Sequence, residues 1–181
     1  GVKAGAHHCG YTAFSVDISG LVRYGQENIL AVRLDSRENP DIPPFGHVID
    51  YMTYGGIYRD VYLDIKNPVY LEDVFVHAQL EQKGARLFTD IAIRGKADAM
   101  SVRQQIRKKG EGEFKTLENE RAAGEECQIK LSCRMEEVEL WEIGRPVLYE
   151  IKTQLCSGSR TLDENITVFG FRKAEFKRDG F

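Results

Sequence analysis

Apolar and polar residues alternate in one short run after another along this chain of 181 residues. The cleanest run spans residues 127–135, where cysteine, isoleucine, leucine, cysteine and methionine occupy every second position. A period of two residues is the pattern of a β-strand with one buried face. No stretch of useful length shows the helical period. The sequence therefore predicts an all-β fold.

The second part of the chain is predicted to be an immunoglobulin-like β-sandwich. Asn67 and Pro68 form a turn dipeptide between two strand-rich regions, and proline cannot continue a strand ladder. The alternating runs that follow give about seven short strands over about 110 residues, which is typical of this fold. We expect the strands near residues 74–80, 87–93, 102–106, 114, 127–135, 147–155 and 165–176, with residues 108–126 forming mostly a long hairpin connection.

The first part of the chain shows the same alternation but too little of it for a complete domain. We expect strands at residues 11–19, 28–35 and 57–66. A jelly roll needs about eight strands to close. Residues 1–67 are therefore expected to be a truncated part of a larger β-domain.

A proline-rich loop leads into the last of these strands. Three prolines in residues 39–45 fix φ and lack a backbone donor, so this stretch is neither helix nor central strand. Gly55 and Gly56 follow, and glycines allow a positive φ or a close approach of two backbone segments. The carboxylate of Asp50 lies between these two shaped stretches, which makes it the most interesting side chain of the loop.

Three segments of the chain resemble glycoside hydrolase family 2, the family of β-galactosidases, β-glucuronidases and β-mannosidases. The end of that family's N-terminal sugar-binding jelly roll is similar to LDSRENPDIPP and IDYMTYGGIYRDVYL. An earlier strand of the same domain is similar to HHCGYTAFSVDIS, and the close of the family's second domain to LWEIGRPVLYEIKTQL and FGFRKAEFKRDGF. The chain departs from the family at Cys9, where a glycine is usual, and at Gly144 and Arg145.

The resemblance implies that residues 1–67 are the C-terminal part of the sugar-binding jelly roll and residues 68–181 the immunoglobulin-like second domain. The catalytic barrel would follow Phe181, and with it the two glutamates of retaining hydrolysis, about 5 Å apart. The chain itself is then an inactive accessory fragment of a β-galactosidase-like enzyme, which scaffolds the barrel and contributes a loop to the sugar site. The alternative is a free-standing carbohydrate-binding or adhesion module of immunoglobulin type.

The resemblance also assigns a substrate-binding residue, Asp50. In the family, the aspartate at this place contacts sugar hydroxyls and, in some β-galactosidases, helps to hold a monovalent cation. A carboxylate offers about four lone-pair sites to such partners. Tyr51 and Tyr54 would form an aromatic wall for a sugar ring, whereas Tyr58 is expected to pack in the core. The alternative for Asp50 is a turn cap or an ion pair with Arg59, because most loop aspartates make turns.

Composition argues against several other classes of protein. A net charge of −3 without a concentrated basic face argues against nucleic-acid binding. No run approaches the roughly 20 apolar residues of a membrane span. The four cysteines and four histidines lack metal-ligand spacing, so no metal or cofactor is expected in the chain itself. We expect free thiols in a reducing compartment, the cytoplasm.

We predict that the isolated chain associates through residues 11–66. Strands that lack their neighbours expose unpaired backbone groups, and these recruit other chains by hydrogen bonding. Light scattering at high concentration should therefore detect dimers or larger species, with the sandwich uninvolved. A monomer over the whole concentration range would contradict this prediction.

Overall fold

Eight β-strands form the regular structure of the residues that this computed structural model describes, which are 1–37, 39–42, 55–117, 121–122, 128–174 and 178. No helix occurs among these residues, so they include none that could cross a membrane. The chain divides into two compact units, Gly1–Leu63 and Asp64–Phe181. All eight strands belong to the second unit. The prediction of an all-β chain is confirmed.

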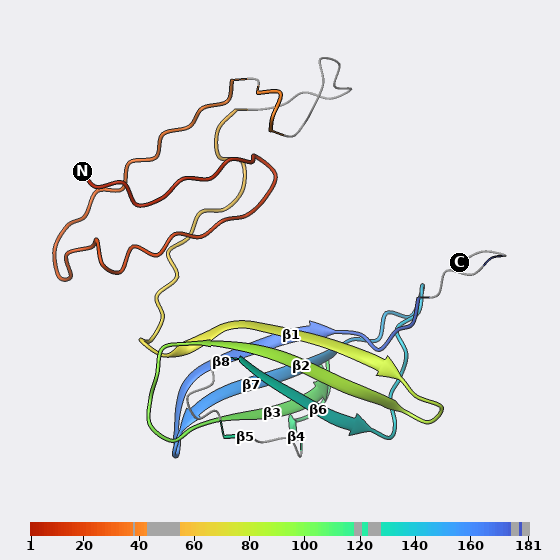
Figure 1. The fold of residues 1–181 in the computed structure, drawn as a ribbon. Coiled ribbons are helices and arrows are strands. Elements are labelled where there is room, and N and C mark those ends of the chain that lie inside the picture. Colours follow the sequence, from red (N-terminus) through yellow and green to blue (C-terminus); the bar gives the residue numbers. More distant parts are fainter. Residues whose placement is uncertain (38, 43–54, 118–120, 123–127, 175–177, 179–181) are drawn as a thin grey trace. The chain divides into compact units, whose positions relative to one another are not determined.

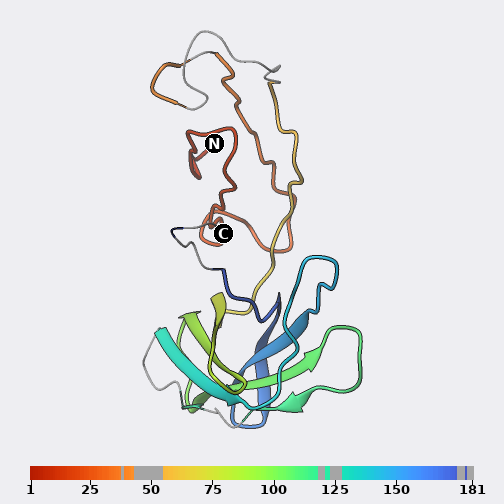
Figure 2. The ribbon, with the colours of Figure 1, turned by 90° about the vertical axis from the view of Figure 1, so that its right-hand side faces the viewer.

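The second unit is a sandwich of two antiparallel sheets (Figures 1 and 2). One sheet has the order β1-β2-β6, and these strands span Tyr70–Leu80, Ala85–Arg94 and Gln128–Met135. The other has the order β4-β3-β7-β8, with β5 also paired to β3. Its strands span Met100–Lys108 (β3), Lys115–Thr116 (β4), Arg121–Ala122 (β5), Tyr149–Ser157 (β7) and Arg160–Phe169 (β8). The sheet of β1, β2 and β6 corresponds to strands A, B and E of the immunoglobulin fold. In the facing sheet, β3, β7 and β8 correspond to strands C, F and G.

A tight hairpin joins β1 to β2, and its glycine explains why the chain turns there. Gly84 has a φ of +80°, and a Cβ at this position would lie 2.0 Å from the carbonyl oxygen of Met135. Only glycine tolerates both conditions. The turn places Leu80 opposite Ala85, and every second residue of β2 from Ala85 to Ile93 is then buried.

Two groups of buried apolar side chains fill the space between the sheets. The first group consists of Val69, Leu71, Ile91, Ile93, Met100, Val102, Ile129, Leu131 and Leu155. The second consists of Ala85, Leu87, Ile106, Leu117, Ile151 and Phe171. Complete burial of a valine, leucine, isoleucine or phenylalanine side chain contributes about 1.5–3 kcal/mol to the free energy of unfolding.

A layer of three polar residues separates the two apolar groups. Thr89, Gln104 and Thr153 are each at most 1% exposed, and each lies on its strand between a residue of one group and a residue of the other. The Nε2 amide of Gln104 donates to the hydroxyl of Thr89 at 3.1 Å and to that of Thr153 at 3.0 Å. Because Thr89 belongs to one sheet and Gln104 to the other, the bond between them joins the sheets inside the core, whereas Thr153 is the neighbour of Gln104 within its own sheet.

The last strand lies earlier in the chain than residues 165–176, so that prediction was wrong in its boundaries. Gly158, with a φ of +56°, makes a tight turn that places Arg160 opposite Ser157, and β8 therefore begins at once. At its other end the ladder stops at Phe169, and Phe171 forms a bridge with Leu140 instead. The strand expected near residue 114 is the two-residue β4.

The three strands predicted before residue 67 are not assigned in the structure. Residues 11–19, 28–35 and 57–66 run as extended segments without a ladder (Figure 1). Apolar side chains on them are exposed, Ile29 by 90% and Val61 by 70%. A strand needs hydrogen-bonded neighbours, and a sheet of few strands is marginal on its own. Alternation of apolar and polar residues was therefore not sufficient to predict strands in this part of the chain. The jelly-roll assignment of residues 1–67 stays a prediction.

We predict that Gln104→Leu lowers the free energy of unfolding of the sandwich by about 1–3 kcal/mol for each threonine hydroxyl that loses its buried partner. Urea unfolding of the purified chain measures this change. The control is the triple variant with Thr89→Val and Thr153→Val added, which removes both partners of each bond. It should recover much of the lost stability. A single variant as stable as the original chain would show that the polar layer contributes nothing.

Candidate functional site

The residues that the sequence assigns to substrate binding, Asp50, Tyr51 and Tyr54, lie outside the described part of the chain. The structure does describe the segments on either side of them. Both belong to the first unit, so the geometry of the loop base can be established without reference to the sandwich.

The segment before the loop is held by an ion pair and a turn. Arg37 Nε lies 2.8 Å from Asp35 Oδ1, and its Nη2 lies 2.5 Å from Asp35 Oδ2. The hydrogen bonds from Arg37, by its side chain and its backbone N–H, hold the pKa of Asp35 at about 2, below its ordinary value of 3.8. Next, Asn39 Oδ1 accepts the backbone N–H of Asp41 at 2.9 Å, which forms a turn.

The segment after the loop approaches the segment before it. A Cβ on Gly55 would lie 2.9 Å from Ser36 Oγ, so a larger residue here would require the serine side chain to shift. Gly56 has a φ of +99°. The sequence predicted a positive φ or a close backbone approach for this pair, and the positive φ is confirmed at Gly56, whereas Gly55 approaches the side chain of Ser36 and not its backbone. Ser36 and Gly55, which lie on either side of the loop in the sequence, are therefore close together in space.

Two neighbouring residues have roles that the sequence did not predict. The hydroxyl of Tyr58 donates to the carbonyl oxygen of Gly10 at 3.1 Å, and the Arg59 guanidinium lies 5.5 Å from the centre of the Tyr58 ring. Tyr58 is 53% exposed, so the expected core packing does not occur. Its hydroxyl instead forms a hydrogen bond between the segment after the loop and the start of the chain. The contacts of Arg37 with Asp35 were also missed, although an acid and a base two residues apart before a proline-rich loop were a usable signal.

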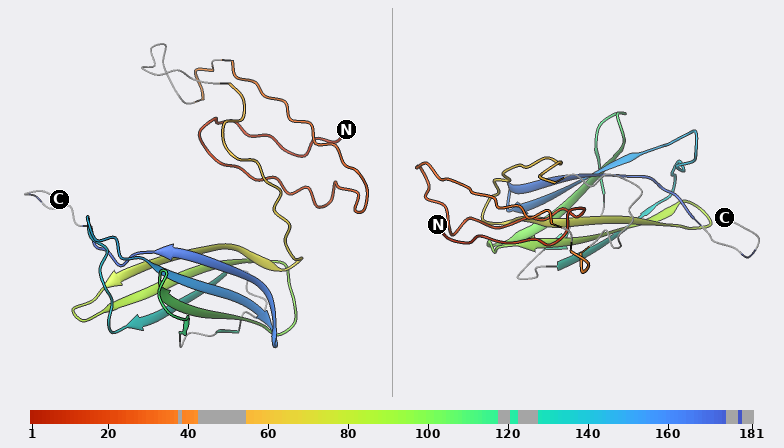
Figure 3. Two further views of the ribbon diagram at one scale, coloured as in Figure 1. Left: turned by 180° about the vertical axis from the view of Figure 1, so that it is seen from behind. Right: turned by 90° about the horizontal axis from the view of Figure 1, so that it is seen from above.

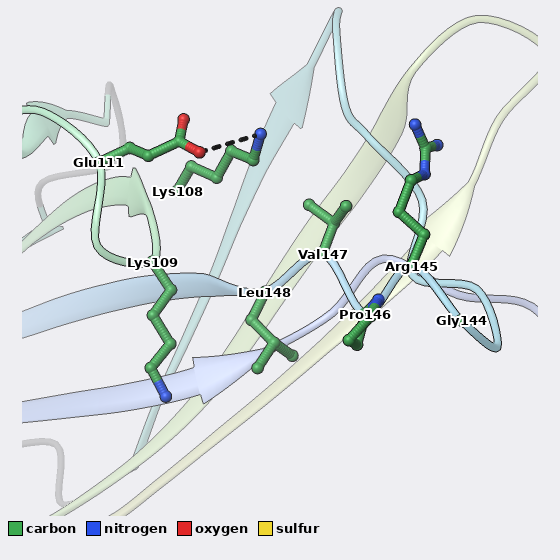
Figure 4. Close-up of a pocket in the computed structure, with 8 residues that line it drawn as sticks. All are labelled: Lys108, Lys109, Glu111, Gly144, Arg145, Pro146, Val147 and Leu148. Carbon is green, nitrogen blue, oxygen red and sulfur yellow. Dashed lines mark ion pairs between the residues drawn. The ribbon is translucent and has the colours of Figure 1, made fainter.

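In the sandwich, a hollow of about 390 Å³ lies between the end of β3 and the turn that precedes β7 (Figure 4). It is lined by Lys108, Lys109, Glu111 and residues 144–148. Lys108 Nζ lies 2.9 Å from Glu139 Oε1 and 3.3 Å from Glu111 Oε1. The contact with Glu139 raises the pKa of Lys108 and lowers that of Glu139. Retaining glycoside hydrolysis needs two carboxylates about 5 Å apart, and the lining of this hollow supplies one.

A second hollow of about 370 Å³ carries three glutamates, Glu81, Glu136 and Glu137. Glu81 forms ion pairs with two arginines, because its two oxygens lie 3.0 Å from Arg86 Nε and 3.4 Å from Arg134 Nε. Across the residues with assigned positions, no cluster of three histidine, cysteine or acidic side chains is suited to a metal ion. Cys9 and Cys156 are free thiols in that part of the chain.

Comparison with known proteins gives one consistent result. The model of the family described as "Glycosyl hydrolases family 2" matches residues 69–172. A protein named β-galactosidase from Thermoanaerobacter pseudethanolicus is 35% identical over 184 residues, which is 99% of this chain and 24% of that protein. A putative β-glucuronidase from Formosa agariphila is 28% identical over 99% of this chain and 22% of its own length.

A solved structure shows the same fold. The crystal structure of a putative β-galactosidase from Bacteroides fragilis aligns with a TM-score of 0.77 and 24% identity, over 95% of this chain and 28% of that one. The chain thus spans about a quarter of the length of the proteins that it matches.

We predict that the Asp35 carboxyl titrates near pH 2 in a side-chain NMR titration. Arg37→Gln should move its midpoint up toward 3.8, because the pair with Arg37 is the main cause of the low pKa. Arg33→Gln is the control and should shift it less, because Arg33 acts only through its charge. A lowered pKa stabilises the folded form above the ordinary pKa, and this contribution is lost as the pH falls through about 2. An unchanged midpoint in Arg37→Gln would contradict the assignment.

Proposed function

The chain belongs to glycosyl hydrolase family 2, and we propose that it is the non-catalytic accessory portion of a β-galactosidase-like glycosidase of that family. In this proposal the sandwich scaffolds the catalytic barrel, and the first unit contributes the loop that carries Asp50 to the sugar site. The barrel supplies the two glutamates that cleave the glycosidic bond.

The observation that carries the proposal is the extent of the match. The likeness to a β-galactosidase covers 99% of this chain but 24% of that protein, so the chain corresponds to one portion of a larger enzyme. The 35% identity to a protein with that name favours a β-galactoside as the substrate class. The match to a putative β-glucuronidase at 28% makes a β-glucuronide the second candidate.

The geometry of the loop base supports a binding role for the loop. Ser36 lies against Gly55, Arg37 pairs with Asp35 on one side, and the Tyr58 hydroxyl donates to the carbonyl oxygen of Gly10 on the other. Loops presented by a firm base are the usual carriers of binding residues. In the proposal Asp50 accepts hydrogen bonds from sugar hydroxyls or holds a monovalent cation. Tyr51 and Tyr54 pack against the sugar ring.

Sequencing of the gene that encodes this chain tests the proposal. The expected result is a reading frame that continues past Phe181 into a (β/α)₈ barrel with two catalytic glutamates. The purified full-length product should then hydrolyse a nitrophenyl β-galactoside, with nitrophenyl β-glucuronide as the comparison substrate. A reading frame that stops at Phe181 would favour the free-standing carbohydrate-binding or adhesion module.

We predict that Asp50→Asn in the full-length enzyme lowers kcat/KM about tenfold to hundredfold. The variant keeps the shape of the side chain and removes its charge, and charge-assisted contacts are worth roughly 1.5–3 kcal/mol. The melting temperature should barely change, because loop substitutions away from the core usually shift stability by less than about 0.5 kcal/mol.

Asp41→Asn is the matched control, because it removes the same charge from the same loop region and should leave kcat/KM unchanged. A turn-capping Asp50 would give the opposite result, with a lower melting temperature and normal turnover for each folded molecule. That outcome would remove Asp50 from the sugar site.

A further inference from the structure

A short hairpin at residues 141–146 lies beside the point where the chain leaves the sandwich. The backbone N–H of Glu142 donates to the carbonyl oxygen of Arg145 at 3.2 Å, and the N–H of Arg145 donates to the carbonyl oxygen of Glu142 at 3.0 Å. Ile143 and Gly144 form the tip between them, and Gly144 has a φ of +87°. A positive φ at the third residue of a four-residue turn is typical of type II, which favours glycine there. The tip is therefore a defined turn.

Ile143 is exposed although the local structure does not require an apolar residue there. Its side chain is 93% exposed, and no large apolar side chain among the described residues is more exposed. Turns are dominated by glycine, proline and small polar residues, and a core residue would be covered. Single exposed apolar side chains are nevertheless common on protein surfaces. The meaning of Ile143 therefore depends on where the tip lies.

Three contacts hold the base of the hairpin against the segment that leaves the sandwich. The backbone N–H of Trp141 donates to the carbonyl oxygen of Phe171 at 2.8 Å, and Phe171 is fully buried. A Cβ on Gly170 would lie 3.0 Å from the Cβ of Trp141, and the Arg172 guanidinium lies 5.6 Å from the centre of the Trp141 ring. Figures 1 and 3 show the hairpin and the end of β8 side by side at one end of the sandwich. The tip is therefore fixed next to this exit.

The surface beside the tip is hollowed and carries more basic than acidic groups. Gly144 of the tip lines the hollow of about 390 Å³ (Figure 4). The charged side chains of its lining are Lys108, Lys109, Arg145 and Glu111. On the exit side, Trp141 and Arg172 add an aromatic ring and a further cation. Aromatic and arginine side chains are enriched at protein interfaces. A partner of this surface should thus offer an apolar pocket for Ile143 with acidic groups around it.

We propose that this hairpin tip is the surface on which the sandwich docks the catalytic barrel of the same polypeptide. The inference rests on the proposed function, in which the barrel follows Phe181. The likeness to a β-galactosidase covers 24% of that protein, so most of such an enzyme lies outside this chain. Arg172 and Phe181 are nine positions apart, and an extended segment of that length spans at most about 30 Å. The barrel then begins within that distance of the exit, where the tip also lies.

A small surface is sufficient for a partner that is attached so closely. Separate proteins bury roughly 1,200–2,000 Å² in a stable interface. A tethered domain has an effective concentration in the millimolar range, so weaker contacts are enough. The turn and its bonds to the exit segment are already formed, so docking has to order few groups. A rigid apolar tip can therefore hold the barrel against this end of the sandwich.

Hydrogen–deuterium exchange followed by mass spectrometry tests the proposal on the 181-residue chain and on the full-length protein. The backbone N–H groups of Ile143 and Gly144 have no acceptor among the described residues, so they should exchange fast in the 181-residue chain. In the full-length protein the tip should exchange at least about tenfold more slowly, because the docked barrel keeps water away from it.

Ile143→Asp is the test variant, and Ile166→Asp is its matched control. Ile166 is 48% exposed on β8, opposite Lys152 and away from the tip. In the full-length protein, Ile143→Asp should return the tip to the fast exchange of the 181-residue chain, because a carboxylate is costly to bury in an apolar pocket. Ile166→Asp should leave the tip protected. In the 181-residue chain, Ile143→Asp should barely change the urea midpoint, since the side chain is exposed there.

The outcomes separate the docking surface from the proposed function. A full-length protein that hydrolyses a nitrophenyl β-galactoside, but whose tip exchanges as fast as in the 181-residue chain, overturns the docking surface and leaves the proposed function intact. Protection that persists in Ile143→Asp also overturns it. Protection that disappears on dilution, together with a dimer in light scattering, assigns the tip to a second copy of the chain and overturns docking of the barrel. A full-length protein without glycosidase activity overturns the proposed function, and the docking surface with it.

Discussion

The hydrogen bond from the Gln104 amide to the hydroxyl of Thr89 constrains how the two sheets of the sandwich face each other, and Thr153 holds the same amide from within its own sheet. Apolar burial is non-directional, so the two apolar groups would tolerate many relative positions of the sheets. A buried amide must meet its partners within hydrogen-bond distance, because an unsatisfied polar group inside a protein is costly. The bond between Gln104 and Thr89 therefore favours one relative position of the sheets.

The contacts at the two ends of the sandwich also join residues that are distant in the chain. Asn67 reaches the carbonyl oxygen of Leu162 only because β1 and β8 lie at the same corner, and Phe171 is buried only because β8 ends beside Trp141. The first unit shows the same principle on a smaller scale, where Ser36 and Gly55 close the base of a long loop. In both units, a few close contacts between residues that are distant in the chain fix where a segment begins or ends.

Much of the sandwich could be predicted from alternation, and the limits of that prediction are physical. The period of two identifies which face of β2 is buried, and Thr89 lies on that face as expected. The period does not identify Gln104 as the hydrogen-bond partner of Thr89. The strand predicted at residues 165–176 lies at Arg160–Phe169, because a ladder ends where its partner strand ends. In the first unit the same alternation formed no ladder among the residues that have assigned positions. The proposed site itself, Asp50 with Tyr51 and Tyr54, rests on the family resemblance and not on geometry.

The sequence by itself determined the all-β class, the positive φ at Gly56 and membership of the family. These features follow from the local geometry of the backbone and from short motifs, which act over a few residues. Only the tertiary structure decided that a bulge exposes the carbonyl oxygen of Leu162 and that Asn67 binds it from 95 residues away. Such contacts depend on how whole sheets pack, and no local pattern records the position of a partner that is so distant in the chain.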